Sequence, residues 1–245
     1  MYSKITQCCI EWIREFFRDA GRKTAVIGIS GGKDSAVCAK LCVEALGQVN
    51  VIGVLMPNGV QPDIDDSRAV ISQTGIRSVE INIIDAYQSI TYQLNKCIGL
   101  ETSAQAAINL APRLRMATLY AVAQSADKAL VCNCTNYSEA MMGYGTLYGD
   151  IAGDFSPLGR LTVSQVMDMG EELGLSRDIA RKPPADGLTG KTDEDNLGFT
   201  YDDVEKVLAG VPMLNVRPAI EARIKASRFK RNMIRIPVFE PEKII

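Results

Sequence analysis

The sequence of 245 residues lacks the segments that would place a protein in a membrane or on nucleic acid. No stretch approaches the ~18 consecutive apolar residues of a membrane span. The opening MYSKITQCCIEWIREFF alternates apolar and charged residues, as a surface helix does, and has no apolar signal-peptide core. The 27 basic and 29 acidic residues nearly balance, without a dense run of Lys and Arg. We therefore expect a cytoplasmic protein that binds neither membrane nor nucleic acid.

Histidine is absent, and the seven cysteines include no second C-x-C or C-x-x-C pair beside Cys132-Asn133-Cys134. This spacing is far from a zinc-site pattern, so a metal-binding or sulfur-carrying pair is the less favoured interpretation. An odd number of cysteines, several inside apolar patterns, is typical of reduced thiols. We expect Cys38, Cys42, Cys132 and Cys134 to be structural thiols in a reducing compartment.

No repeat, low-complexity segment or Pro/Ser-rich linker divides the chain. A hydrophobic content of 47% is enough for a full core, so we expect residues 1–245 to form a single domain. The least regular part is residues 143–200, which are rich in glycine. These turns predict loops near a site and not a second core.

Short apolar runs alternate with helical patterns along the first half of the chain. Runs typical of strands buried on both faces of a parallel sheet lie at residues 25–29, 50–56, 78–83 and 129–134. Helical spacing extends over residues 34–46, 63–75 and 102–126, the last of which contains Pro112. This alternation predicts an α/β fold with a three-layer, doubly wound parallel sheet.

The turn after the first predicted strand reads Ser30-Gly31-Gly32-Lys33-Asp34-Ser35. In an open parallel sheet, such a turn aims backbone N–H groups and the positive end of a helix at a ligand. The glycines let phosphate oxygens approach the backbone, and the serines add hydroxyl donors. A tight turn with Asp34 as a helix cap is the alternative, but the strand-turn-helix context favours a phosphate site.

This turn resembles the S-G-G-x-D-S loop of the PP-loop ATP pyrophosphatases and matches neither G-x-x-x-x-G-K-[ST] nor G-x-G-x-x-G. These enzymes cleave ATP between the α and β phosphates and attach AMP to a substrate oxygen. They include NAD, GMP, asparagine and argininosuccinate synthetases and tRNA-thiolating enzymes. The loop alone does not distinguish among them.

Four strings farther along the chain resemble motifs of NAD synthetases, in the same order. NLAPRLRM at 109–116 resembles G-N-x-x-A-R-x-R-M, and CTNYSE at 134–139 resembles G-T-x-N-x-S-E. YGTLYGDIAGDFSPLG at 144–159 resembles Y-F-T-K-Y-G-D-x-x-x-D-x-x-P-L-G. KPPADGLTGKTDEDNLGFTYDDVE at 182–205 resembles K-P-P-S-A-D-L-x-x-G-Q-T-D-E-x-x-L-G-x-x-Y. The resemblance covers nearly the whole chain and implies an adenine nucleotide α-hydrolase-like fold.

The resemblance implies ATP-dependent amidation of deamido-NAD to NAD with ammonia. The carboxylate of deamido-NAD attacks the α phosphorus of ATP and releases pyrophosphate, and ammonia then attacks the NAD-adenylate, releasing AMP. This chemistry needs Mg²⁺ and preorganised donors more than a side-chain nucleophile, so the lack of histidine is no obstacle.

The resemblance also implies a homodimer with the deamido-NAD site at the subunit interface, where we place the helix at 102–126. No glutaminase pattern accompanies the synthetase pattern, so we expect free ammonia as the donor, with a separate glutaminase subunit left open.

Site residues follow from the same resemblance. The catalytic carboxylates, which are also the magnesium ligands, are Asp34 and Glu139. The ATP-binding residues are Gly28, Ile29, Ser30, Gly31, Gly32, Lys33, Asp34, Ser35 and Thr135, to which we add Arg160. The deamido-NAD-binding residues are Arg113, Arg115, Asp154 and Lys230. Five of these site residues have an ordinary alternative: Arg113 and Arg115 as an exposed helix face, Thr135 and Glu139 as helix-start residues, and Asp154 as a turn former.

Four positions depart from the family pattern. Two family lysines are Leu147 and Val163 here, the hydroxyl residue before A-D is Pro184, and the His of H-K-R is Phe229. Arg160 is our candidate to replace the charge lost at Val163, with a solvated loop arginine as the alternative. These losses leave two other functions open: a PP-loop enzyme that adenylates another substrate, and a weakly active or non-catalytic nucleotide-binding relative.

Overall fold

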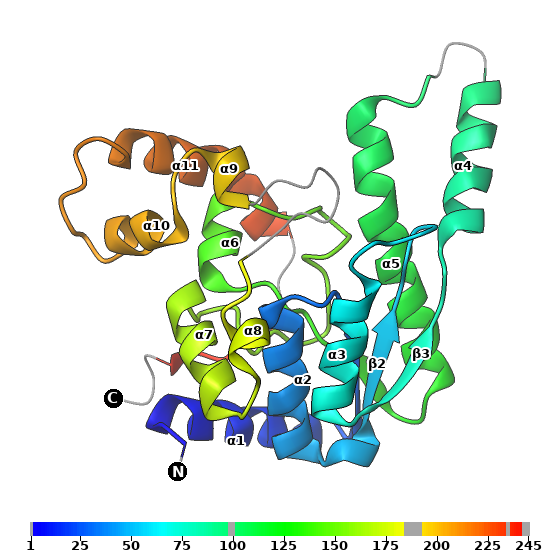
Figure 1. Ribbon diagram of the computed structural model, residues 1–245, viewed down its shortest axis with the longest axis horizontal. Helices are drawn as coiled ribbons and strands as arrows, with labels where there is room; N and C mark the ends of the chain where they lie inside the picture. Colours follow the sequence, from blue (N-terminus) through cyan, green and yellow to red (C-terminus); the bar gives the residue numbers. More distant parts are fainter. Residues whose placement is uncertain (1, 98–100, 184–192, 234–235, 242–245) are drawn as a thin grey trace.

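A parallel sheet of four strands lies among the helices of the computed structural model, which describes residues 2–97, 101–183, 193–233 and 236–241 (Figure 1). The strands are β1 (Thr24–Gly28), β2 (Val51–Leu55), β3 (Arg77–Glu80) and β4 (Ala129–Val131), in the order β3-β2-β1-β4. Val26 of β1 lies beside Ile52 on one side and Val131 on the other. All four predicted strands are therefore present, with slightly different ends.

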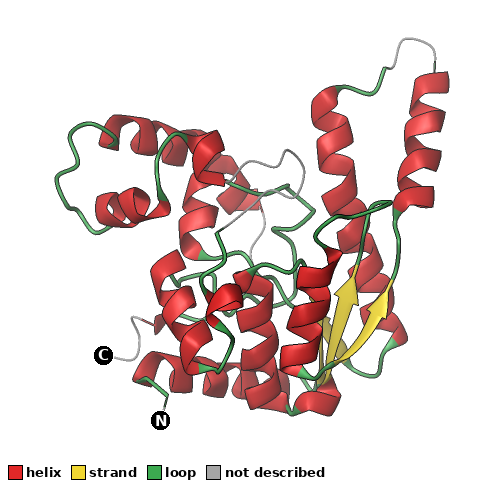
Figure 2. Cartoon of the chain, in the orientation of Figure 1, coloured by secondary structure: helices red, strands yellow, loops and turns green. Residues whose placement is uncertain are grey.

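Helices flank this sheet and form a further group beside it (Figures 1 and 2). In the first half they are α1 (Lys4–Asp19), α2 (Lys33–Leu46), α3 (Ile64–Thr74), α4 (Ile84–Lys96) and α5 (Ala104–Ser125), with a 3-10 turn η1 at Gln48–Asn50. In the second half they are α6 (Tyr137–Met142), α7 (Val163–Glu172), α8 (Arg177–Ala180), α9 (Asp193–Leu197), α10 (Tyr201–Leu208) and α11 (Arg217–Met233).

Successive residues of β1 enter different hydrophobic clusters on the two faces of the sheet. Ala25 and Ile27 pack in a cluster that includes buried residues of α1, α2 and α7. Val26 packs in a second cluster with residues of α5. Because side chains alternate along a strand, an unbroken apolar run serves both faces at once. The predicted three-layer, doubly wound α/β fold is confirmed.

The helices predicted near the start of the chain and at residues 102–126 are also present, as α1 and α5. α1 is amphipathic and buries Ile13 and Phe17, and the Phe17 ring meets Phe155 edge to face with centroids 5.0 Å apart. α5 continues through Pro112 to Ser125 and buries its second half against the sheet. A proline removes one backbone donor, but the packed face outweighs that local loss.

Two sequence predictions about burial are wrong. β3 was expected to be buried on both faces but is exposed along its whole length, because it forms the edge of the sheet. Residues 143–200 were expected to hold loops without a second core, yet they contribute part of a third hydrophobic cluster; the helix expected at residues 162–173 within this region is present as α7. That cluster consists of Met142, Val163, Tyr201, Val204, Val207 and Ile220. Two of its helices, α7 and α10, start at capping boxes on Thr162 and Thr200.

Within the described residues, no helix is both long enough and apolar enough to cross a lipid bilayer.

Candidate active site

The predicted phosphate-binding turn lies between β1 and α2, at the carboxyl end of the central strand. Its two serines fix its shape: the Ser30 hydroxyl accepts from the Gly32 N–H at 3.2 Å, and the Ser35 hydroxyl donates to the Gly32 carbonyl at 2.9 Å. Gly32 precedes the first residue of α2, Lys33, so the backbone N–H groups of the first turn are aimed out of the helix. Backbone N–H groups arranged in this way can receive an anion.

Position 31 requires glycine for two reasons: its backbone conformation and the closeness of the neighbouring helix. Its φ of +80° lies in the left-handed region that favours glycine, and a Cβ there would approach the Ser67 backbone nitrogen of α3 to 2.8 Å. The turn is therefore packed against α3 as well as against the end of β1.

Asn136 brings the two predicted catalytic carboxylates together. Its side-chain amide donates to Asp34 Oδ1 at 2.9 Å, and its Oδ1 accepts from the Glu139 N–H at 3.0 Å. Its own N–H donates to Glu139 Oε2 at 3.3 Å, which completes a capping box at the start of α6. Asn136 is fully buried, and it contacts the Asp34 carboxylate through its side chain and the Glu139 carboxylate through its backbone N–H. We did not select this residue from the sequence, although Asn followed by Glu three residues later is a capping-box signature.

Two lysines lie beside the turn. Lys33 is 1% exposed and its Nζ lies 2.9 Å from Asp34 Oδ2. Lys182 donates from Nζ to Asp66 Oδ2 at 2.6 Å and to the Gly31 carbonyl at 3.4 Å. Lys182 was missed as a site residue, although it opens the string KPPADGL; only the tertiary structure places it against the turn. Both amines contribute positive charge where an anion would bind.

Thr135 and Arg160 both lie near the start of α6. The Thr135 hydroxyl lies 3.4 Å from the Asp150 carbonyl, which it can donate to, and Asn133 Nδ2 donates to it at 3.4 Å. The exposed Arg160 holds its guanidinium 5.9 Å from the ring centroid of Tyr137, the first residue of α6. Arg160 is thus close to the helix that carries Glu139.

A loop at residues 143–150 gathers two of the predicted dinucleotide-binding residues. Arg113 of α5 donates from Nε to the Leu147 carbonyl at 3.2 Å. Lys230 of α11 donates from Nζ to the carbonyls of Gly143 and Gly145 at 2.8 and 2.6 Å. Burial lowers the pKa of Lys230 from its ordinary value. The structure therefore brings Arg113 and Lys230 to one loop from distant parts of the chain.

The other two predicted dinucleotide-binding residues make partly buried contacts with the fold. Arg115 donates to the Met56 carbonyl at 3.0 Å, and burial lowers its pKa. Asp154 accepts from the Tyr120 hydroxyl at 3.1 Å and from the Val131 N–H at 2.8 Å. Burial, together with the nearby Asp154, raises the pKa of Tyr120 to about 12. Arg115 and Asp154 therefore tie α5 to the ends of β2 and β4.

The four departures from the family pattern have different surroundings. Val163 is 4% exposed in the third hydrophobic cluster, so this position belongs to the core in this chain. Leu147 is half-buried in the 143–150 loop, and Phe229 is 57% exposed on α11. Pro184 lies outside the described residues.

Comparison with known proteins gives consistent matches along the chain. A family model described as NAD synthase matches residues 5–235. The NH(3)-dependent NAD(+) synthetase of Finegoldia magna is 38% identical over 232 residues, which cover 94% of both sequences.

Two solved structures are also similar. NMN synthetase from Francisella tularensis is 32% identical with a TM-score of 0.86, over 98% of this chain and 100% of that one. NH3-dependent NAD synthetase from Campylobacter jejuni is 27% identical with a TM-score of 0.75, over 95% and 97% of the two chains.

Proposed function

Because the chain belongs to the NAD synthase family, we propose that it is a ligase that amidates deamido-NAD to NAD with ammonia and ATP. The observation that carries this function is Asn136, which joins the pyrophosphatase-type turn at Asp34 to Glu139 of α6. The match to the family model and to the Finegoldia magna enzyme confirms the family resemblance given by the sequence motifs.

The turn and its two lysines bind the phosphates of ATP in this proposal. Residues 28–35 supply backbone donors at the start of α2, and Lys33 and Lys182 offset the charge that grows on the leaving pyrophosphate. Thr135 and Arg160 extend this site along α6.

Asp34 and Glu139 would hold Mg²⁺ in this site. Carboxylate oxygens are the ligands that Mg²⁺ prefers, and Asp34 of α2 and Glu139 of α6 both accept hydrogen bonds from Asn136, so the donor set fits the ion. When bound, Mg²⁺ neutralises phosphate charge. The hydrogen bonds from Asn136 keep both carboxylates oriented before any ligand arrives.

Deamido-NAD binds, in our proposal, across the loop at residues 143–150. Arg113 and Lys230 present positive charge there, and Arg115 and Asp154 fix the floor between α5 and the sheet. The carboxylate of the substrate then faces the α phosphorus of ATP, and ammonia displaces AMP from the adenylate.

We further propose that residues 1–245 act as one cytoplasmic domain that pairs as a homodimer through α4 and α5. Among the residues that the structure describes, no side chain of α4 is fully buried within the chain, and Ile90 and Tyr92 are 38% and 56% exposed. Ile108 on α5 is 47% exposed. An apolar surface of this kind supports burial against a second copy.

A second candidate function has one observation in its favour. The structure of this chain is more similar to the solved NMN synthetase, with a TM-score of 0.86, than to the C. jejuni NAD synthetase, with a TM-score of 0.75. An enzyme that forms NMN by the same chemistry would amidate nicotinate mononucleotide, which carries the same carboxylate but lacks the adenylate half. The losses at Leu147 and Phe229 are compatible with a smaller substrate.

One assay separates these functions. The purified protein is incubated with ATP, Mg²⁺ and ammonium, and with either deamido-NAD or nicotinate mononucleotide, while pyrophosphate and the amide product are measured. We expect a higher kcat/KM for deamido-NAD; the reverse order would establish the mononucleotide function. Nucleotide binding without pyrophosphate release from either substrate would reject both and leave a non-catalytic relative. Replacing ammonium with glutamine, in protein free of glutaminase, should abolish amidation.

A further inference from the structure

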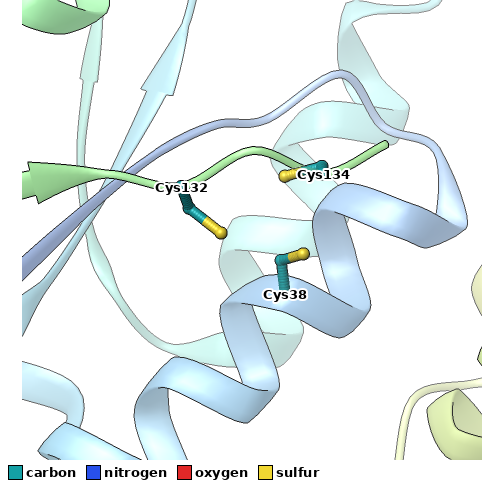
Figure 3. A group of neighbouring side chains, drawn as sticks. All are labelled: Cys38, Cys132 and Cys134. Atoms are coloured by element: carbon teal, nitrogen blue, oxygen red, sulfur yellow. The ribbon is translucent and has the colours of Figure 1, made fainter. Parts of the chain in front are cut away.

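Three cysteines from separate parts of the chain converge behind the nucleotide turn. The sulfur atoms of Cys38, Cys132 and Cys134 all lie within 4.8 Å of one another. Figure 3 shows Cys38 on α2 facing Cys132 and Cys134 on the segment that follows β4. Cys38 is 0% and Cys132 3% exposed, whereas Cys134 is half-buried. The cluster is therefore enclosed, with one sulfur nearer the surface.

The distances between these sulfur atoms are close to those between thiolates that share one metal ion. With metal–sulfur bonds of about 2.3 Å, three thiolates around one ion lie about 4 Å apart, so small shifts of the side chains would suffice. A set of ligands made only of thiolates selects soft ions such as Zn²⁺, Cd²⁺ and Cu⁺ over Mg²⁺ or Ca²⁺. Among the described residues, this is the group of His, Cys, Asp and Glu side chains that meets the spacing of a metal site.

The cluster is linked to the active site through short segments of chain. Cys38 lies one helical turn after Asp34 on α2, and Cys134 lies two residues before Asn136. Asn136 in turn donates to Asp34. An ion bound to the three sulfurs would join α2 to the segment that carries Asn136, and so restrain both sides of the carboxylate pair.

We propose that Cys38, Cys132 and Cys134 form a binding site for a soft, thiophilic metal ion behind the nucleotide turn. Binding forms three metal–sulfur bonds and releases the thiol protons to solvent, with no change in oxidation state. The site stands on the positions of the sulfurs, so it does not depend on which substrate the enzyme uses.

Cd²⁺ is the probe for this site. The reduced full-length protein, in buffer free of thiols and chelators, is titrated with Cd²⁺ while the ultraviolet charge-transfer band of cadmium thiolate is recorded. We expect one Cd²⁺ per chain, tighter binding at higher pH, and a higher Tm with the ion than without it, because the ion binds only the folded site. Cys97→Ala serves as the matched control, since Cys97 is exposed and outside the cluster, and it should keep all three effects.

Cys132→Ala should lose the band and the rise in Tm. Cys38→Ser and Cys134→Ser test the same site with smaller changes in volume, so the result does not depend on one variant folding. A band of unchanged intensity in Cys38→Ser and Cys134→Ser would overturn the proposal, as would wild-type protein that binds no Cd²⁺. A disulfide between two of these three cysteines, located by peptide mass mapping after exposure to air, together with no Cd²⁺ binding by the reduced protein, would overturn the proposal in favour of a disulfide.

Discussion

Asp34 and Glu139 are the residues on which the proposed chemistry depends most directly. Changing either to Ala should abolish pyrophosphate release, because each change removes a carboxylate at the charged centre of the reaction. The fold should persist, since Asp34 and Glu139 are not core residues. Steady-state rates across a Mg²⁺ titration, with circular dichroism for folding, provide the measurement. A Glu139→Ala protein with the wild-type rate and magnesium dependence would show that the metal assignment is wrong.

We predict that Asn136 acts through the carboxylates and not on the substrate. Asn136→Ala removes the donor to Asp34 and the cap on α6, so we expect activity or magnesium affinity to fall about 10- to 100-fold, the usual range for residues that orient metal ligands. The Mg²⁺ concentration for half-maximal rate should rise, which loss of folded protein alone would not cause. Asn95→Ala is the control, because Asn95 is exposed and bonds Thr102 near the α4–α5 connection. Equal magnesium curves for wild type and Asn136→Ala would contradict this role.

Arg160 is predicted to supply the cation that the family has at the position of Val163. Arg160→Ala should raise the ATP KM, and Arg160→Lys should restore much of the affinity because it returns a positive charge. A surface arginine without a ligand contributes only about 0–1 kcal/mol, so the loss of such a residue would leave the ATP KM unchanged. Arg22→Ala, at another exposed arginine, should leave the KM unchanged. Unchanged ATP kinetics in Arg160→Ala would leave Arg160 as a solvated loop residue.

Restoring the family lysine at Val163 is not a suitable test of this idea. Val163 is 4% exposed among apolar residues of α10 and α11, and an ammonium group there would lose its hydration without a partner.

At the scale of elements, the nucleotide turn depends on how closely α3 packs against it. Gly31→Ala should cost about 1–3 kcal/mol of overpacking in addition to the strain of a positive φ, because the new Cβ would meet Asp66 and Ser67 at 2.8 Å. The Tm should fall and the ATP KM should rise together. Gly21→Ala is the matched control: its φ is +63° but nothing lies within 4 Å of the new Cβ, so it carries strain without a clash. Equal losses of stability in the two variants would show that α3 moves aside for the new Cβ without a measurable loss of folding free energy.

At the scale of the whole molecule, the exposed apolar surface of α4 and α5 predicts a dimer. Ile108→Asp should shift sedimentation from dimer toward monomer, because it places a charge in the proposed interface. Val49→Asp, at a residue that is 78% exposed and far from α5 in sequence, should leave the dimer intact. A wild-type protein that sediments as a monomer at assay concentrations would reject the proposed interface.

The sequence by itself determined the features that reside in contiguous residues. The apolar run at 25–29, the Gly-Gly turn and the helix after it predicted both the central strand and the anion site, because a strand, a turn and a helix N-terminus are encoded locally. The family could be identified from strings such as NLAPRLRM, since their residue types recur in one order along the chain. The carboxylates Asp34 and Glu139 followed from the same strings.

Only the tertiary structure decided which residues that are distant in the sequence lie close together in space. Nothing in the sequence shows that β3 is an edge strand, that Lys182 reaches Gly31, or that Asn136 meets Asp34, because each depends on how separate elements pack. The pair Cys132 and Cys134 was unconvincing as a metal site for the same reason. Its third sulfur comes from Cys38, almost a hundred positions earlier, and only the packing of α2 against the segment after β4 brings the three together.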